Sequence, residues 1–121
     1  MKMTNAAAVN NLTNLVGIVK RDITLPAKVS YAISRNVRKL EEELKDYFDT
    51  RNKTIIELGT KDKDGNTGIS TEDTEKIEEY KRRMSDIESS EIEVDIFKIK
   101  IDDLSGDYPV SVITGMEFMI E

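Results

Sequence analysis

The sequence of 121 residues contains no cysteine, no histidine and no tryptophan. Without cysteine there are no disulfides and no thiolate chemistry, and without histidine the commonest general base and metal ligand of proteins is missing. A metal ion would have to be bound by oxygen atoms alone. No apolar run approaches the length of a membrane span, and no signal peptide is recognisable. We therefore expect one domain over residues 1–121, located in the cytoplasm, with no membrane partner.

Charge is unevenly distributed along the chain. The net charge is -6, yet residues 1–39 carry seven basic side chains and a single acidic one, which leaves a charge of -12 on residues 40–121. The basic third attracts anions, whereas the acidic remainder repels a long nucleic acid. A small anion is therefore a better candidate ligand than a duplex.

The segment from Thr24 to Gly59 predicts the longest element, a helix over about 25–58. Thr24 is expected to cap its start, and Gly59 is expected to end it in a left-handed conformation. Its apolar residues recur at spacings of four and three, as on a helix that packs against another helix. The residues of this stripe are Val29, Ile33, Val37, Leu40, Leu44 and Tyr47.

A second apolar stripe predicts a helix over about 71–89. Residues 59–70 are polar and contain glycine, which is typical of a loop. Because this loop is long enough to reverse the chain, the two helices are expected to form an antiparallel hairpin. The stripe consists of Ile77, Tyr80, Met84 and Ile87.

The same loop has some features of a calcium site. Asp62, Asp64 and Asn66 stand at alternate positions, but Thr67 replaces the glycine of the sharp turn and Asp73 replaces the bidentate glutamate of such loops. We therefore predict no metal site.

Three shorter elements complete the predicted fold. A helix over about 4–21, capped by Thr4 or Asn5, precedes the long helix. From Glu91 the apolar residues alternate with polar ones, which predicts a strand over about 91–101; its partner is 22–24, 67–70 or the same strand of another subunit. Pro109 begins a short helix over about 109–120. The fold class is mainly α, an antiparallel helical hairpin with an extra N-terminal helix, one short β element and a short C-terminal helix.

Two of these elements suggest self-association. The C-terminal helix is apolar around most of its circumference, and such a surface on a monomer usually marks an interface. The predicted strand has no assigned partner within the chain, and an unpaired strand edge tends to pair with another chain. A homo-oligomer is therefore expected.

One group of residues has the chemistry of an anion site. Lys28, Tyr31, Arg35 and Arg38 follow one another at spacings of three, four and three, so they share one face of the long helix. Arginine binds phosphate with two hydrogen bonds and tyrosine stacks on a base. A small phosphorylated or cyclic nucleotide is the ligand that these residues predict, with amides from Asn10 and Asn14 as further contacts. The alternatives are ion pairs of the arginines with the glutamates at 41–43 and a solvated asparagine face.

Catalytic signatures are missing. No serine has a histidine to act as its base, and the glycines do not match the spacing of a phosphate-binding loop. We predict a protein that is not an enzyme and that uses no cofactor.

Four segments carry a resemblance to a known family: ITLPAKVSYAISRNVRKLEEELKDY, the loop around KDKDGN, EIEVDIFKI and GMEFMIE. Together they resemble a family of small uncharacterised proteins encoded by phages and prophages of Gram-positive bacteria. The resemblance covers most of the chain from Ile23 onward. It implies a phage accessory protein in the host cytoplasm, or a minor component of virion assembly.

Two functions are compatible with this origin. The first is a non-catalytic antagonist of host immunity, which binds and sequesters a small nucleotide signal or blocks a host protein. The second is a virion assembly or scaffold factor that docks through its helical hairpin and its apolar C-terminus.

Overall fold

The computed structural model describes all residues from Met1 to Glu121 and has a mainly α fold. Two 3-10 turns, at Ile101–Asp103 and Glu117–Met119, accompany the regular elements. In chain order these are β1 (Lys2–Thr4), α1 (Asn5–Val19), α2 (Ala27–Leu58), β2 (Thr60–Lys61), β3 (Thr67–Gly68), α3 (Thr74–Ser89), β4 (Glu91–Glu93) and α4 (Val110–Gly115).

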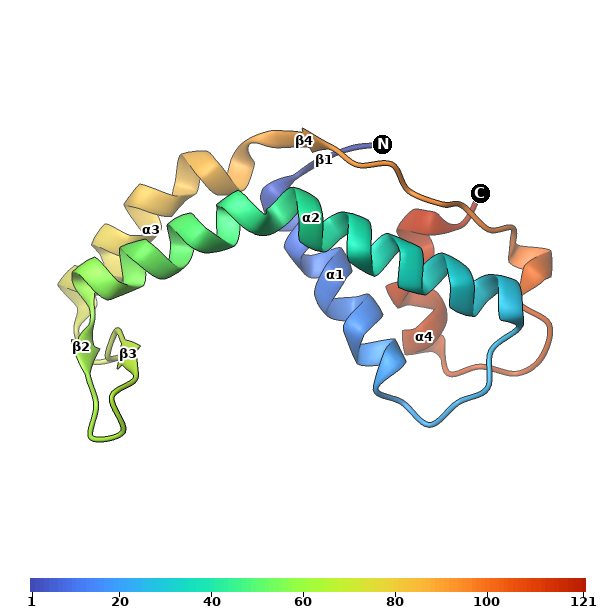
Figure 1. Ribbon diagram of the computed structural model, residues 1–121, viewed down its shortest axis with the longest axis horizontal. Helices are drawn as coiled ribbons and strands as arrows, with labels where there is room; N and C mark the ends of the chain where they lie inside the picture. The colour runs from blue at the N-terminus through green and yellow to red at the C-terminus, as the bar shows by residue number, and fades with distance from the viewer.

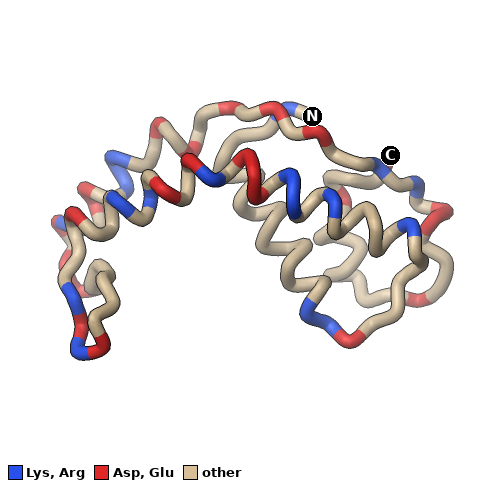
Figure 2. The backbone as a smooth tube through the Cα atoms, viewed as in Figure 1, with Lys and Arg blue, Asp and Glu red and all other residues tan.

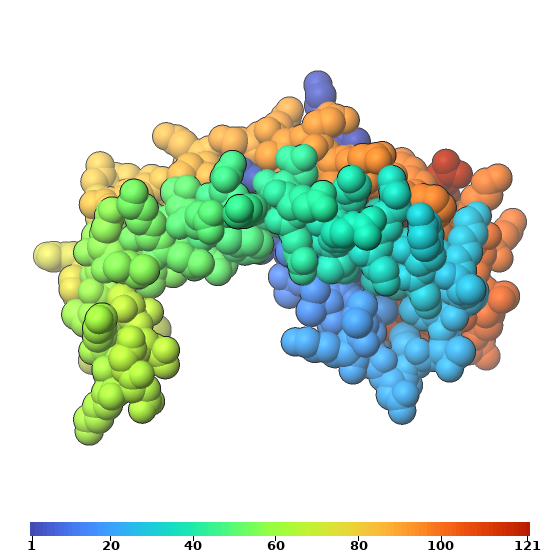
Figure 3. Space-filling model, in the orientation of Figure 1, coloured from blue at the N-terminus to red at the C-terminus, as the bar shows by residue number.

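Helix α2 joins two parts of the molecule (Figure 1). Its 32 residues span about 48 Å. The N-terminal half packs with α1 and α4 in a part that we call the body. The C-terminal half runs alongside α3 in a narrow part that we call the arm, and the β2–β3 hairpin hangs from its end. The space-filling view shows an arch, with a hollow beneath α2 between the hairpin and α1 (Figure 3).

The core is concentrated in the body. Most of the stripe predicted for α2 is buried, and α1 buries an apolar face against it. The arm is thinner, because Met84 is the only buried residue of α3. The buried residues of these stripes are Val29, Ile33, Leu40, Leu44 and Tyr47 on α2 and Ala8, Leu12, Leu15 and Ile18 on α1.

Both ends of α2 differ from the prediction in how they are capped. Its N-cap is Pro26, which has no side-chain hydrogen bond to the helix, so Thr24 is not the cap. Gly59 is extended, with φ -84° and ψ 174°, and is not left-handed. Its small size matters for a different reason. A Cβ atom there would lie 2.6 Å from the carbonyl oxygen of Ile55 and 2.7 Å from that of Gly68, because the chain turns directly into the hairpin.

The predicted loop of residues 59–70 contains the β2–β3 hairpin. One carboxylate oxygen of Asp62 accepts hydrogen bonds from the backbone N–H groups of Asp64 and Asn66, at 2.9 and 3.0 Å. Gly65 supplies the positive φ of +83° that the turn requires. The acidic and amide residues of this loop therefore shape a turn, and no group of three or more acidic side chains that could bind a metal ion is present in the chain.

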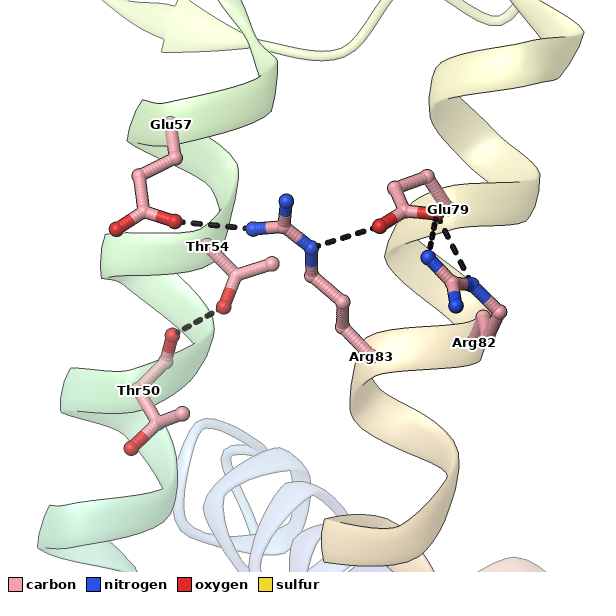
Figure 4. A network of polar contacts seen from close by, with 6 residues as sticks. All are labelled: Thr50, Thr54, Glu57, Glu79, Arg82 and Arg83. Atoms are coloured by element: carbon pink, nitrogen blue, oxygen red, sulfur yellow. Dashed lines mark hydrogen bonds and ion pairs between the residues drawn. The ribbon is translucent and has the colours of Figure 1, made fainter.

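Polar contacts fasten the two helices of the arm to each other (Figure 4). The Arg83 guanidinium donates to Glu57 on α2 at 2.9 Å and to Glu79 on α3 at 3.0 Å. Hydrogen bonds from Arg82 and Arg83 lower the pKa of the Glu79 carboxyl. Helix α3 itself begins at Thr74, three residues later than predicted, because Asp73 caps it by accepting from the N–H of Lys76.

The predicted strand is shorter than expected and has a different partner. β4 pairs antiparallel with β1, with Met3 opposite Ile92, so none of the three predicted partners is used. Thr4 caps α1 as predicted, by accepting from the N–H of Ala7 at 3.1 Å, and β1 immediately precedes it. Beyond Glu93 the chain crosses α2 and forms only an isolated parallel bridge, between Ile99 and Ile120, so the predicted strand does not continue to residue 101.

The C-terminus is folded into the body. Helix α4 ends at Gly115 and a 3-10 turn follows, so the predicted helix over 109–120 is interrupted. Val112, Met116 and Met119 are fully buried. The expected exposed apolar patch is therefore reduced to the partly exposed residues Ile113, Phe118 and Ile120, and the predicted strand has its partner within the chain. Self-association remains a prediction, but an unpaired strand no longer supports it and the C-terminal apolar residues support it less than expected.

Candidate functional site

The predicted anion-binding residues lie where residues 94–103, which we call the crossing segment, pass over α2. The Nζ atom of Lys28 is 3.0 Å from a carboxylate oxygen of Asp103, and a guanidinium nitrogen of Arg35 is 3.2 Å from Asp95. Figure 2 shows the basic residues of α2 beside the acidic residues of this crossing segment. The basic N-terminal third is thus partly neutralised by carboxylates that are 75 and 60 residues away in the sequence.

The carboxylate of Asp103 is held in its charged form. The backbone N–H of Lys100 donates to it at 2.8 Å, and this hydrogen bond, followed by that from Lys28, lowers the pKa of Asp103. Both ion pairs are at the surface, since the side chains of Lys28 and Asp95 are 53% and 77% exposed. Pairs of this kind contribute at most about 1 kcal/mol, so an anion can compete for the two cations.

Tyr31 and Arg38 remain accessible on this face. The Tyr31 side chain is 56% exposed. Its ring contacts the ring of Phe97 in an edge-to-face arrangement, with the two centroids 5.3 Å apart. Arg38 is exposed and forms no ion pair. The face keeps a braced aromatic ring and one unpaired guanidinium.

The two predicted asparagine contacts lie elsewhere. Asn10 and Asn14 are exposed on α1, and no hydrogen bond joins either to the four residues on α2. Asn14 belongs to a surface depression between α1 and α4. This depression is lined by Thr13, Asn14, Gly17, Ile18, Arg21 and Ser111. The structure therefore does not gather the six predicted residues into one site.

A buried amide positions the crossing segment. Asn36 is fully buried; its Nδ2 donates to the carbonyl oxygen of Phe97 at 3.0 Å, and its Oδ1 accepts from the N–H of Phe97 at 2.8 Å. Asn36 is not among the predicted site residues. The available signal was its place between Ile33 and Leu40, at helical spacing within the apolar stripe, where a polar residue needs buried partners.

A second depression, of about 390 Å³, lies at the far end of the arm, between α2 and the hairpin. Ile56 is 65% exposed there. Not one charged side chain is among the lining residues, although 35% of the chain is charged. We call this depression the arm-end depression, and it is lined by Asn52, Ile55, Ile56, Gly65, Asn66 and Thr67.

Two tyrosines of the arm, Tyr47 on α2 and Tyr80 on α3, also have perturbed pKa values. Burial, and then the charge of Glu88, raises the pKa of Tyr47, whose hydroxyl donates to the Glu88 carboxylate at 3.4 Å. Burial likewise raises the pKa of Tyr80. The Arg51 guanidinium lies over the ring of Phe48, 4.9 Å from its centroid. The hydrogen bond of Tyr47 to Glu88 joins α2 to α3, whereas Arg51 and Phe48 lie on the same helix, α2.

Comparison with protein-family models, with curated proteins and with solved structures gave no match. No helix is both long enough and apolar enough to span a membrane.

Proposed function

We propose that this protein is a non-catalytic binding protein that docks on another protein through its arm. The observation that carries the proposal is the exposed, uncharged arm-end depression around Ile56. A partner protein offers apolar side chains together with backbone polar groups, and these match a lining of isoleucine, asparagine and threonine. An anion or a nucleic acid requires cations instead. A segment of a protein is therefore the occupant that this chemistry favours.

The shape of the molecule supports the same proposal. Because α2 is continuous through body and arm, it holds the arm-end depression at a fixed distance from the body. A preformed, rigid surface costs less conformational entropy on binding than a flexible one. From the resemblance to phage proteins we expect this activity in the host cytoplasm, either as a blocker of a host protein or as a virion assembly factor. The assembly role rests mainly on the helical hairpin of α2 and α3, since Val112, Met116 and Met119 of the apolar C-terminus are buried.

Cross-linking tests the proposal, and the lack of native cysteine makes it site-specific. An Ile56→Cys variant carrying a photoreactive maleimide is mixed with extract of a Gram-positive host. We expect one dominant adduct, absent with an equally labelled Asp107→Cys variant, because Asp107 is exposed on the body. The same adducts from both positions would show only non-specific contact and would refute docking by the arm.

A small phosphorylated ligand is the second candidate, favoured by the exposed Tyr31 braced by Phe97 and by the unpaired Arg38. A nucleotide would stack on the tyrosine and displace Asp95 from Arg35. Thermal shift with a panel of cyclic and linear nucleotides tests this, since a ligand far above its Kd stabilises by a few kcal/mol. Binding should be lost in Arg35→Ala and partly kept in Arg35→Lys. The absence of any shift would exclude this site.

A further inference from the structure

Arg21 is a cation without an acidic partner. It follows α1 and is exposed, between the exposed residues Lys20 and Asp22. Its Nη1 donates to the hydroxyl of Ser111 at 2.9 Å, which fixes the guanidinium between the end of α1 and the start of α4. Guanidinium has five N–H donors, and the chain uses one of Arg21's. The remaining donors lie at the edge of the depression that also contains Asn14.

The depression at Arg21 is lined by donors and contains no carboxylate. It has a volume of about 220 Å³. The amide of Asn14 makes no hydrogen bond to the chain, and the hydroxyl of Ser111 accepts from Arg21 while keeping its own hydrogen to donate. The hydroxyl of Thr13 already donates to Val9, at 2.8 Å. Three side chains therefore offer unused donors to one small volume.

Gly17 of α1 is one of the residues that line the depression. Glycine within a helix costs about 1 kcal/mol relative to alanine. No atom lies within 4 Å of the position that a Cβ of Gly17 would occupy, so neighbouring packing does not require the glycine. Because Gly17 lines the depression, a large side chain at this position would take up part of its volume.

Another depression, which we call the apolar depression, adjoins the depression at Arg21. Ile18 and Arg21 line both. The apolar depression has a volume of about 190 Å³. Most of its lining is apolar, from the end of α1, the connection to α2 and the first turns of α2. The apolar members are Ile18, Val19, Ile23, Leu25 and Ile33.

We propose that Arg21 binds a small oxyanion that carries an apolar group. The oxyanion would accept hydrogen bonds from Arg21, Asn14 and Ser111, and the apolar group would lie in the apolar depression. Guanidinium pairs equally well with carboxylate and phosphate, so the shared chemistry is a planar or tetrahedral oxyanion next to an aryl or alkyl group. This site is separate from both the arm-end depression and the α2 face.

Titration followed by ¹H–¹⁵N NMR tests the site with four probes: phenyl phosphate, benzoate, inorganic phosphate and benzyl alcohol. Phenyl phosphate or benzoate should shift the amides of Gly17, Leu25 and Ser111 with saturation, and whichever binds more tightly identifies the anion. Inorganic phosphate should bind at least about tenfold more weakly, because it leaves the apolar depression empty, a difference of about 1.4 kcal/mol. Benzyl alcohol alone should give no saturation.

Two variants decide whether the contacts are specific. Arg21→Gln should weaken the better probe about tenfold or more, while Lys45→Gln, which removes another exposed and unpaired cation, should leave the Kd unchanged. Gly17→Leu keeps the net charge but fills the depression, and should weaken binding to a similar extent. If Lys45→Gln weakens binding as much as Arg21→Gln does, or Gly17→Leu has no effect, only long-range charge is acting and the proposal is refuted. Failure of every probe to saturate at millimolar concentration would also refute it.

Discussion

Replacing the buried Asn36 by leucine should destabilise the protein far more than replacing an exposed asparagine. The side chain is fully buried and makes two hydrogen bonds with the backbone of Phe97, at 2.8 and 3.0 Å. Leucine fills a similar volume but leaves one N–H and one C=O without partners. An unsatisfied buried group costs about 1–3 kcal/mol, and Phe97 is only partly buried, so we expect a loss of about 2–4 kcal/mol.

Urea unfolding followed by circular dichroism measures this loss, with Asn10→Ala as the control. Asn10 is exposed and forms no side-chain hydrogen bond, so its replacement should change the free energy of unfolding by less than about 0.5 kcal/mol. Hydrogen exchange should also become faster at the amide of Phe97 in the Asn36→Leu variant. Equal stability of this variant and the wild type would refute the assignment of Asn36 as the residue that positions the crossing segment.

Three further predictions concern stability. Leu44→Ala should cost about 2–5 kcal/mol by leaving a cavity in the stripe, whereas Lys63→Ala at the exposed hairpin turn should have no measurable effect on the melting temperature; equal shifts would contradict the packing of α2. Gly59→Ala should cost about 1–3 kcal/mol, because the added methyl group meets two backbone carbonyls, and unchanged urea unfolding would argue against this close approach. The pKa of Asp103 is lowered in the folded protein. Its carboxylate therefore contributes to stability above the unfolded pKa of about 4, and this contribution is lost as the pH falls through the folded pKa. Stability should accordingly fall less steeply with acid in Asp103→Asn than in the wild type, and equal steepness would contradict this role.

The helices were largely predictable because their signals are local. The stripe of α2 is set by residue spacing within one element, and so is that of α3. The helix ends were harder. Gly59 was expected to be left-handed, but its conformation is set by contact with Gly68 in the hairpin, and this contact depends on the path of the chain after the helix.

Pairings between distant segments were not predictable in the same way. Nothing local in the first four residues distinguishes the strand β1 from the start of a helix, since its conformation depends on pairing with β4, almost 90 residues later. The burial of Met116 and Met119 likewise depends on the packing of the whole body. An apolar face gives the same sequence signal whether another subunit or the same chain covers it.

The predicted anion site also differs from the observed arrangement because contacts between distant segments decide it. Charge counting correctly located an excess of positive charge in residues 1–39, but the acids that pair with Lys28 and Arg35 come from residues 95–103. The opposite charge of the two chain regions was the available signal. It indicated that they attract, and the ion pairs are the result.

Calorimetry with the protein captured by cross-linking tests the central proposal, that the arm docks on a protein partner, most directly. Purified partner is titrated with the wild type, with Ile56→Asp and with Lys53→Ala, a control on the exposed surface of the same helix. A buried charge without a partner is costly in an apolar contact, so the Kd should rise at least about tenfold for Ile56→Asp and stay unchanged for Lys53→Ala, with both variants folded by circular dichroism. An Ile56→Asp variant that binds as tightly as the wild type would contradict docking through the arm.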